Sequence, residues 1–194
     1  MKPFSARRGG GAYVSLDQLE ARLLANLAAQ VAELVRDGSA EPVGPQDPLE
    51  VLVGLGEGPV QPPDDPVLQR LLPDAYRDDA EGAAEFRRFT EQGLREGKVR
   101  NALTVIESLT AGGMTQDEMQ VSDVEVDVDL DADQVQAWLR CLNDIRLSLA
   151  TRLEITEDDD RRSAIPDNDP AAVLHDIYDW LGFAQETLVQ SLGD

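Results

Sequence analysis

The chain has 194 residues, of which 42% are hydrophobic and only 5% are aromatic. A chain of this length can bury about 70% of its unfolded surface as one domain, so we expect a single domain over residues 1–194 with a core of Leu, Val and Ala. The 38 acidic and 17 basic residues give a net charge of −21, which argues against direct binding to nucleic acid.

The chain has one cysteine, Cys141. This count excludes an intramolecular disulfide and a cysteine-based zinc cluster, and it fits a reducing compartment. No stretch approaches the roughly 20 apolar residues that a membrane-spanning helix needs. Residues 1–16 contain no apolar run typical of a signal peptide. We therefore expect a cytoplasmic protein with no membrane association.

The first predicted elements are two short strands, residues 4–6 and 12–16, joined by a glycine-rich loop. Glycine allows positive φ, so the pattern predicts a small hairpin. No Lys-Ser or Lys-Thr pair follows the glycines, so they do not predict a phosphate-binding loop. A helix is predicted over residues 17–36. Its expected core stripe is Leu19, Leu23, Leu27, Val31 and Leu34.

Residues 38–66 are rich in proline and glycine, which predicts a connection within the domain. Asp47-Pro48 and Asp65-Pro66 each have the pattern of an N-cap followed by proline in the first helical turn. Each pair therefore predicts the start of a short helix. The glycines between them precede further prolines, which excludes a phosphate-binding helix at that point.

Residues 78–109 are predicted to form one or two helices, with a break near Gly97. This segment contains the concentrated basic region of the chain, with glutamates interspersed. Two interpretations remain open: a solvent-exposed face with mixed charges, or a docking surface for an acidic partner. The basic residues are Arg87, Arg88, Arg95, Lys98 and Arg100.

Residues 124–130 alternate valine or leucine with acids, which predicts a half-buried strand that could pair with the hairpin. Its acidic outer face would discourage unwanted strand addition if the strand lies at an edge. The acids do not form a calcium-binding loop, because Val128 and Gln134 replace the glycine and glutamate that such a loop requires.

A central helix is predicted over residues 131–155, and Asp131 with Gln134 forms a capping-box pattern at its start. Arg146 lies beside the apolar stripe, so we expect it to need a partner such as Asp144 or an acid of the last helix, or a route to water. The stripe itself is Val135, Trp138, Leu142, Ile145, Leu149 and Leu153.

The last helix is predicted to begin at Asp169-Pro170 and to pack against the central helix. His175 is expected on its solvent-facing side. No catalytic, cofactor-binding or metal-binding residues are predicted. The apolar stripe is Leu174, Ile177, Leu181, Ala184, Leu188 and Leu192.

These elements predict a mainly α (α+β) fold, a single domain of five or so helices with a small antiparallel sheet made from the N-terminal hairpin and residues 124–130. The helices over residues 16–35 and 174–192 are rich in leucine. Because a single domain of this size would leave part of their apolar surface uncovered, we also expect self-association into a homo-oligomer.

Three segments carry a family resemblance: residues 65–79, 138–155 and 177–189. Together with the N-terminal hairpin and helix, they resemble an actinobacterial family of domains of unknown function, now named for the oxidative-stress regulator AosR and often encoded near the ClpS adaptor. The resemblance implies a cytoplasmic regulator that acts on transcription through partners such as a sigma factor, without known enzymatic chemistry. A Clp-protease-linked adaptor is the first alternative, and an enzyme with an unrecognised site is the second.

The resemblance also implies a redox switch made of an intramolecular thiol pair, and here the chain departs from the family. With Cys141 alone, no such switch can operate within one subunit. Two interpretations of Cys141 remain open. A buried thiol would behave as a small inert hydrophobic group, whereas an accessible thiol could form an intersubunit disulfide or another reversible oxidation product.

Overall fold

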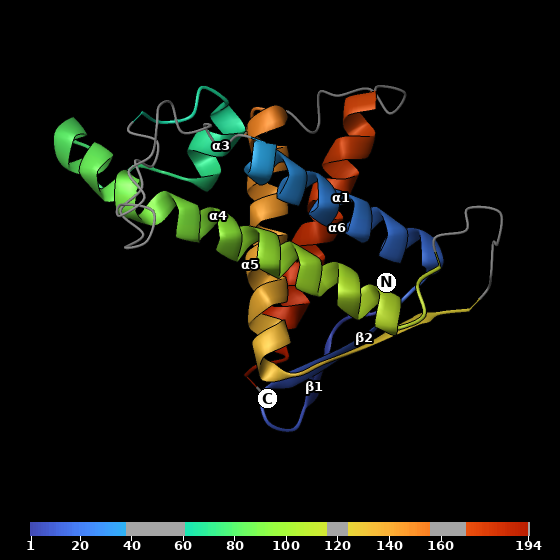
Figure 1. Ribbon diagram of the computed structural model, residues 1–194. Coiled ribbons are helices and arrows are strands. Elements are labelled where there is room, and N and C mark those ends of the chain that lie inside the picture. The colour runs from blue at the N-terminus through green and yellow to red at the C-terminus, as the bar shows by residue number, and fades with distance from the viewer. Residues whose placement is uncertain (38–60, 116–123, 156–169, 194) are drawn as a thin grey trace.

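The computed structural model describes residues 1–37, 61–115, 124–155 and 170–193. It confirms the predicted mainly α (α+β) fold with a small antiparallel sheet; the helix start predicted at Asp47-Pro48 lies outside the described residues. No helix in the described ranges combines the length and apolar character needed to cross a membrane. The elements, labelled as in Figure 1, are β1 (Ser5–Arg7), β2 (Gly11–Leu16), α1 (Gln18–Asp37), α3 (Pro66–Leu71), α4 (Ala80–Ala111), β3 (Val126–Leu130), α5 (Ala132–Arg152) and α6 (Pro170–Gln190).

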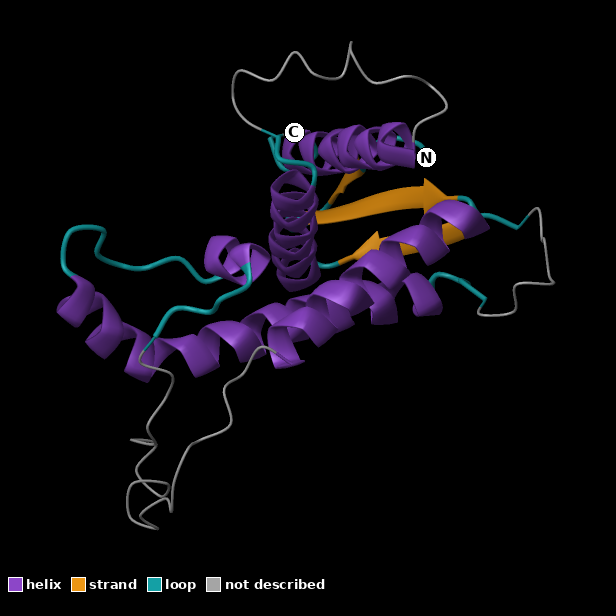
Figure 2. Ribbon diagram, turned by 90° about the horizontal axis from the view of Figure 1, so that it is seen from above, coloured by secondary structure: helices purple, strands orange, loops and turns teal. Residues whose placement is uncertain are grey.

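Helix α5 lies at the centre, and the other helices and the sheet pack around it. Figure 2 shows α1 and α4 on one side of α5 and α6 on the opposite side. The predicted capping box is present: Asp131 Oδ1 accepts from the Gln134 backbone N–H at 2.8 Å, and the Asp131 N–H donates to Gln134 Oε1 at 2.9 Å. The predicted apolar stripe is buried from Val135 to Leu149, whereas its last member, Leu153, is the C-cap and is only half-buried.

The three strands form one antiparallel sheet in the order β1-β2-β3. The hairpin is confirmed, since Gly9 and Gly10 both have positive φ in the turn between β1 and β2. Val14 of β2 lies opposite Val128 of β3, and both are buried. The acids of β3 alternate outward, as predicted. The strand begins at residue 126 rather than 124, because its partner β2 ends at Leu16, which lies opposite Val126.

Helix α1 is present as predicted, but its buried face differs from the predicted leucine stripe. Leu19 is 74% exposed, and Leu27 and Leu34 are only half-buried. Small residues lie on the buried face, where α1 packs against α4, because alanine lets two helix backbones approach closely. The buried positions in α1 are Gln18, Ala21, Leu24, Ala25, Ala28, Val31, Ala32 and Val35.

Helix α4 is a single helix of 32 residues, so the one-helix alternative is confirmed and the break near Gly97 is absent. Glycine in a helix interior costs about 1 kcal/mol relative to alanine, and the packing of α4 along α1 outweighs this cost. The helix ends at Gly112, whose carbonyl accepts from the Asp127 N–H at 3.0 Å. A Cβ on Gly112 would lie 2.7 Å from the Asp127 carbonyl oxygen, so this close approach requires glycine.

Two glycine substitutions should change stability in opposite directions. Gly112→Ala should lower the free energy of unfolding by about 1–3 kcal/mol, because it forces the end of α4 away from β3. Gly93→Ala should raise it by about 0.5–1 kcal/mol, since Gly93 is exposed and an added Cβ would meet no atom within 4 Å. Urea unfolding followed by circular dichroism measures both. Equal effects of the two substitutions would contradict the close approach of Gly112 to Asp127.

Candidate functional site

The five basic residues predicted as a docking cluster do not share one surface. Arg87 and Arg95 are each only 6% exposed, and Lys98 is half-buried, whereas Arg88 and Arg100 are exposed. Both sequence interpretations treated these side chains as solvent-exposed, and that premise is wrong for Arg87 and Arg95. A docking role stays a prediction for the two exposed arginines.

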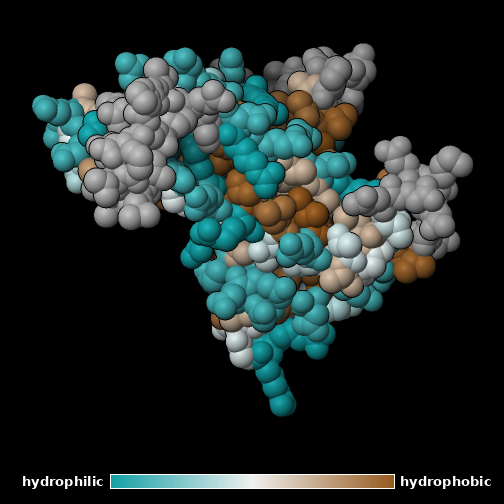
Figure 3. Space-filling view, in the orientation of Figure 1, coloured by the Kyte–Doolittle hydropathy of each residue, from teal (hydrophilic) through white to brown (hydrophobic). Residues whose placement is uncertain are grey.

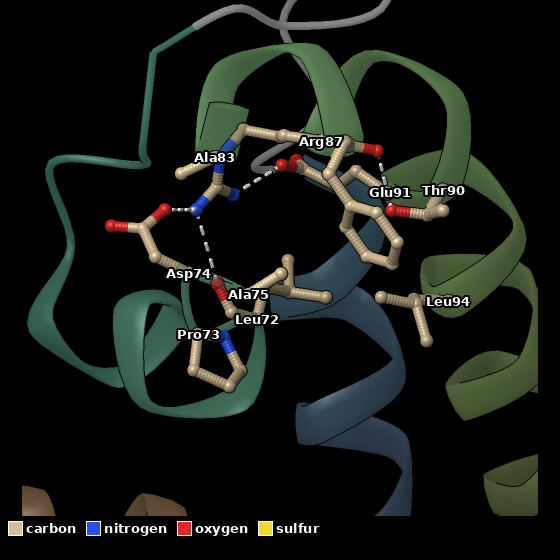
Figure 4. A pocket seen from close by; sticks show the side chains of 10 residues that line it. Leu72, Pro73, Asp74, Ala75, Ala83, Arg87, Thr90, Glu91 and Leu94 are labelled. Atoms are coloured by element: carbon tan, nitrogen blue, oxygen red, sulfur yellow. Dashed lines mark hydrogen bonds and ion pairs between the residues drawn. The ribbon is translucent and has the colours of Figure 1, made fainter. Parts of the chain in front are cut away.

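Arg87, Glu91 and Arg95 form a buried charge network, called the Glu91 network below. Arg87 Nη1 pairs with one Glu91 oxygen, and Arg95 Nε donates to the other, Oε1, at 2.8 Å. Arg87 Nη2 also donates to Asp74 Oδ1 at 2.6 Å and to the Leu72 carbonyl at 3.3 Å, as Figure 4 shows. The Glu91 carboxylate is therefore held between two guanidinium groups.

The Glu91 network also attaches α4 to the C-terminal ends of two other helices. Arg95 Nη1 donates to the Val35 carbonyl in the last turns of α1 at 2.6 Å, and Leu72 is the C-cap of α3. Carbonyls at helix C-termini lack intrahelical donors and favour cations. The sequence signal was the Arg-x3-Glu-x3-Arg spacing, which places all three side chains on one helix face. The adjacent pocket is small, and Asp74, Arg87 and Glu91 are among the residues that line it.

Lys98 forms a second, partly buried ion pair, with Asp144 of α5. Lys98 Nζ donates to Asp144 Oδ1 at 2.7 Å, and Asp144 is buried. Burial raises the pKa of the Asp144 carboxyl, and the hydrogen bond from Lys98 partly offsets this effect. The pair joins the middle of α4 to the middle of α5, so Lys98 has a structural partner inside the protein.

Cys141 lies one turn before Asp144 on α5 and is 2% exposed. Burial raises the pKa of the Cys141 thiol to about 12, and the nearby Asp144 charge acts in the same direction. Since the thiolate is the species that reacts with oxidants, the folded protein holds Cys141 in its unreactive form at neutral pH. The structure therefore supports the interpretation of a buried, inert thiol.

The outer face of the sheet contains exposed ion pairs. Lys2 Nζ donates to both oxygens of Glu125, at 2.8 and 2.9 Å, and Arg7 pairs with Asp129 at 3.0 Å. The Tyr13 hydroxyl donates to Asp127 Oδ1 at 2.6 Å, and this bond lowers the pKa of the Asp127 carboxyl. The acids of β3 are thus partnered across the sheet and remain exposed to solvent.

Arg146 finds its partners on α6. Its Nη1 donates to Gln185 Oε1 at 2.8 Å, its Nη2 donates to the Tyr178 hydroxyl at 3.3 Å, and its guanidinium lies 4.8 Å from the centre of the Tyr178 ring. The first partner expected from the sequence, Asp144, is instead paired with Lys98. Beside Arg146, a shallow open groove runs along the outer face of α6. His175, expected on the surface, is half-buried.

Within residues 1–37, 61–115, 124–155 and 170–193, no group of three or more His, Cys, Asp or Glu side chains is arranged to hold a metal ion. The clearest features of these residues are therefore the two buried charge clusters, the buried thiol and the α6 groove. Sequence reasoning missed the groove, because it depends on which residues of α6 the fold leaves uncovered.

Removing the Glu91 carboxylate should strongly destabilise the fold. Glu91→Ala leaves Arg95 without its carboxylate partner and Arg87 with only Asp74, and breaking a buried pair in this way costs about 3–5 kcal/mol. Arg88→Ala, one residue from Arg87 but exposed, should change the free energy of unfolding by less than about 0.5 kcal/mol. Urea unfolding of both variants and of the unchanged protein measures the differences in the free energy of unfolding. A loss below about 1 kcal/mol for Glu91→Ala would show that the network contributes little.

Comparisons with known proteins place the whole chain in one family. The family model described as "Domain of unknown function (DUF2017)" matches residues 1–192. The "Oxidative stress regulator AosR" of Mycobacterium tuberculosis (strain H37Rv) is 34% identical over 201 residues, covering 97% of this chain and 85% of that protein. The "Putative oxidative stress regulator AosR" of Mycobacterium leprae is 32% identical, covering 89% and 78%. No solved structure matches. The chain therefore belongs to the DUF2017 family.

Proposed function

We propose that this protein is a non-enzymatic regulator in the response to oxidative stress, acting on transcription through a protein partner such as a sigma factor. The observation that carries the proposal is the 34% identity, over 97% of the chain, to proteins named oxidative stress regulators. The net charge of −21 supports an indirect mode of action, because it opposes approach to DNA phosphates.

Co-purification from native extract, with and without peroxide treatment, tests the choice of partner. Recovery of a sigma factor or RNA polymerase supports the proposal, and recovery of Clp components favours an adaptor role instead. A bound metabolite with no protein partner would favour an enzyme. A deletion strain should show an altered transcriptional response to peroxide that the intact gene restores, and an unaltered response would overturn the proposed regulatory role.

The purified protein alone should not bind promoter DNA at about 100 mM salt, a condition in which basic DNA-binding domains still bind tightly. The reason is long-range repulsion between the acidic chain and the duplex. Electrophoretic mobility shift and fluorescence anisotropy assays measure this, with the reconstituted partner complex as the positive control. Submicromolar, sequence-specific binding by the isolated chain would contradict indirect regulation.

Cys141 should not act as a rapid sensor in the folded protein. A thiol reagent such as DTNB should modify native Cys141 about 100-fold or more slowly than the urea-unfolded chain, because reaction requires local or global opening. Cys141→Ala should retain the cellular response to peroxide. Fast, stoichiometric modification of the native protein, or a response lost in a Cys141→Ala protein that still folds, would contradict this expectation.

A further inference from the structure

The outer face of α4 carries an apolar stripe that the fold leaves partly uncovered. Figure 2 shows α1 and α4 as the outermost layer on their side of the molecule, with no other described element beyond them. Leu103 lies on this face and is 38% exposed, and Val99 and Ile106 beside it are only half-buried. These residues follow one another at steps of four and three, so they form one stripe along the helix. Figure 3 shows hydrophobic side chains gathered at the centre of this face, where α1 and α4 meet.

One cation and one acid flank the stripe. Arg100 is exposed, and its ion pair with Glu96 is also exposed and 3.9 Å long. Glu107 is exposed too, and its side chain makes no ion pair or hydrogen bond within the described ranges. Seven residues are nearly two turns, so Arg100 and Glu107 lie on the same side of Leu103. Leu103 is almost midway between them along the helix axis, three residues after Arg100 and four before Glu107.

This order of side chains is complementary to itself. In a two-fold interface the same patch of both copies meets, and an axis perpendicular to α4 reverses the helix direction while it keeps each side chain on its own side. An axis beside Leu103 therefore places Arg100 of each copy opposite Glu107 of the other. On the other side of Leu103, the same axis brings Val99 near Ile106 of the second copy. Opposite charges and apolar side chains are thus matched at once.

The net charge of this layer also permits two copies to meet. The whole chain has a net charge of −21, which opposes contact between two copies over much of their surface. Helix α4 contains five acidic and five basic residues, and α1 contains three acidic and two basic residues. The two helices together therefore have a net charge of −1, and nearly all of the excess negative charge lies elsewhere in the chain.

We propose that the outer face of α4 is a two-fold interface between two copies of this chain, with the two α4 helices antiparallel and Leu103 beside the axis. Stable dimers bury roughly 800 Å² per copy, so the adjoining outer side of α1 contributes to the contact as well. The interface uses a different helix from the two leucine-rich segments on which the sequence-based expectation of self-association rests. It also gives Arg100 an acidic partner. The α4 residues that line the interface are Val99, Arg100, Leu103, Ile106 and Glu107.

Sedimentation of the full chain with matched leucine variants tests the face. The unchanged protein should form a dimer at concentrations up to about 100 μM. Leu103→Glu should weaken the dimer at least tenfold, because it places two like charges together at the axis. Leu174→Glu makes the same change on α6, on the opposite side of α5, at a leucine of nearly equal exposure (40%), and should leave dimerisation unchanged. Circular dichroism and thermal unfolding check that both variants fold.

A charge reversal tests the antiparallel arrangement. Arg100→Glu and Glu107→Arg should each weaken the dimer about fivefold, because each variant sets like charges opposite one another across the axis. The double variant restores opposite charges with their order reversed, so its dimer affinity should return to within about twofold of the unchanged protein. Arg70→Glu, at an exposed position of α3, makes the same change in net charge as Arg100→Glu and should have no effect on dimerisation.

Cross-linking tests the position of the axis. Cys141 is the one native cysteine and is buried, so Leu103→Cys adds a single accessible thiol. Packed helix axes lie 8–10 Å apart, and residues that face each other beside a two-fold axis come within reach of a disulfide. Copper phenanthroline in air should therefore convert Leu103→Cys to a disulfide-linked dimer, whereas Leu174→Cys should stay mainly monomeric on a denaturing gel.

Four results would each overturn the inference. These are a chain that stays monomeric up to about 100 μM, a dimer unaffected by Leu103→Glu, a dimer lost in Leu174→Glu, and a double charge variant as weak as either single one. None of these measurements depends on the proposed function, which the deletion strain tests separately. A monomer with a normal regulatory role, or a dimer without one, would therefore separate the two conclusions.

Discussion

The burial of α5 on several sides is the constraint on which the rest of the structure depends. The helix contacts α1, α3, α4, α6 and the sheet, so it needs apolar side chains around much of its circumference. Trp138, which is 1% exposed, packs edge-to-face against Phe4 at a centroid distance of 5.9 Å and so joins the N-terminal segment to the core. The polar residues that remain on its buried faces must find partners. Asp144 does so through Lys98.

Ion pairs within the structure determine how the charge of the protein is distributed. Three of the cations in residues 87–100 pair with carboxylates inside the structure: Arg87 and Arg95 with Glu91, and Lys98 with Asp144. Lys2 and Arg7 pair with acids on the outer face of the sheet. These five cations are therefore neutralised by acids of the same chain.

Sequence reasoning succeeded where a local rule decides the structure. The capping box at Asp131 and the Asp65-Pro66 helix start depend on neighbouring residues only, and both are present. It failed where the outcome depends on a distant surface. Leu19 is more apolar than Ala28, yet Ala28 is buried, because the close approach of α4 favours a small side chain. Likewise, the sequence around Arg87 does not say whether this side chain is exposed to solvent or buried beside Glu91. The arrangement of α1, α3 and α4 decides which of the two occurs.

The two ends of the Glu91 network have a mechanical consequence for α4. Arg87 contacts the end of α3, and Arg95 contacts the end of α1, two turns further along the same helix. A slide of α4 by one turn, about 5.4 Å, would break both contacts at once and place neither arginine opposite an equivalent acceptor. The two contacts together therefore fix the position of α4 along its own axis, relative to α1 and α3. Helix α6, by contrast, has its main contacts with α5 alone.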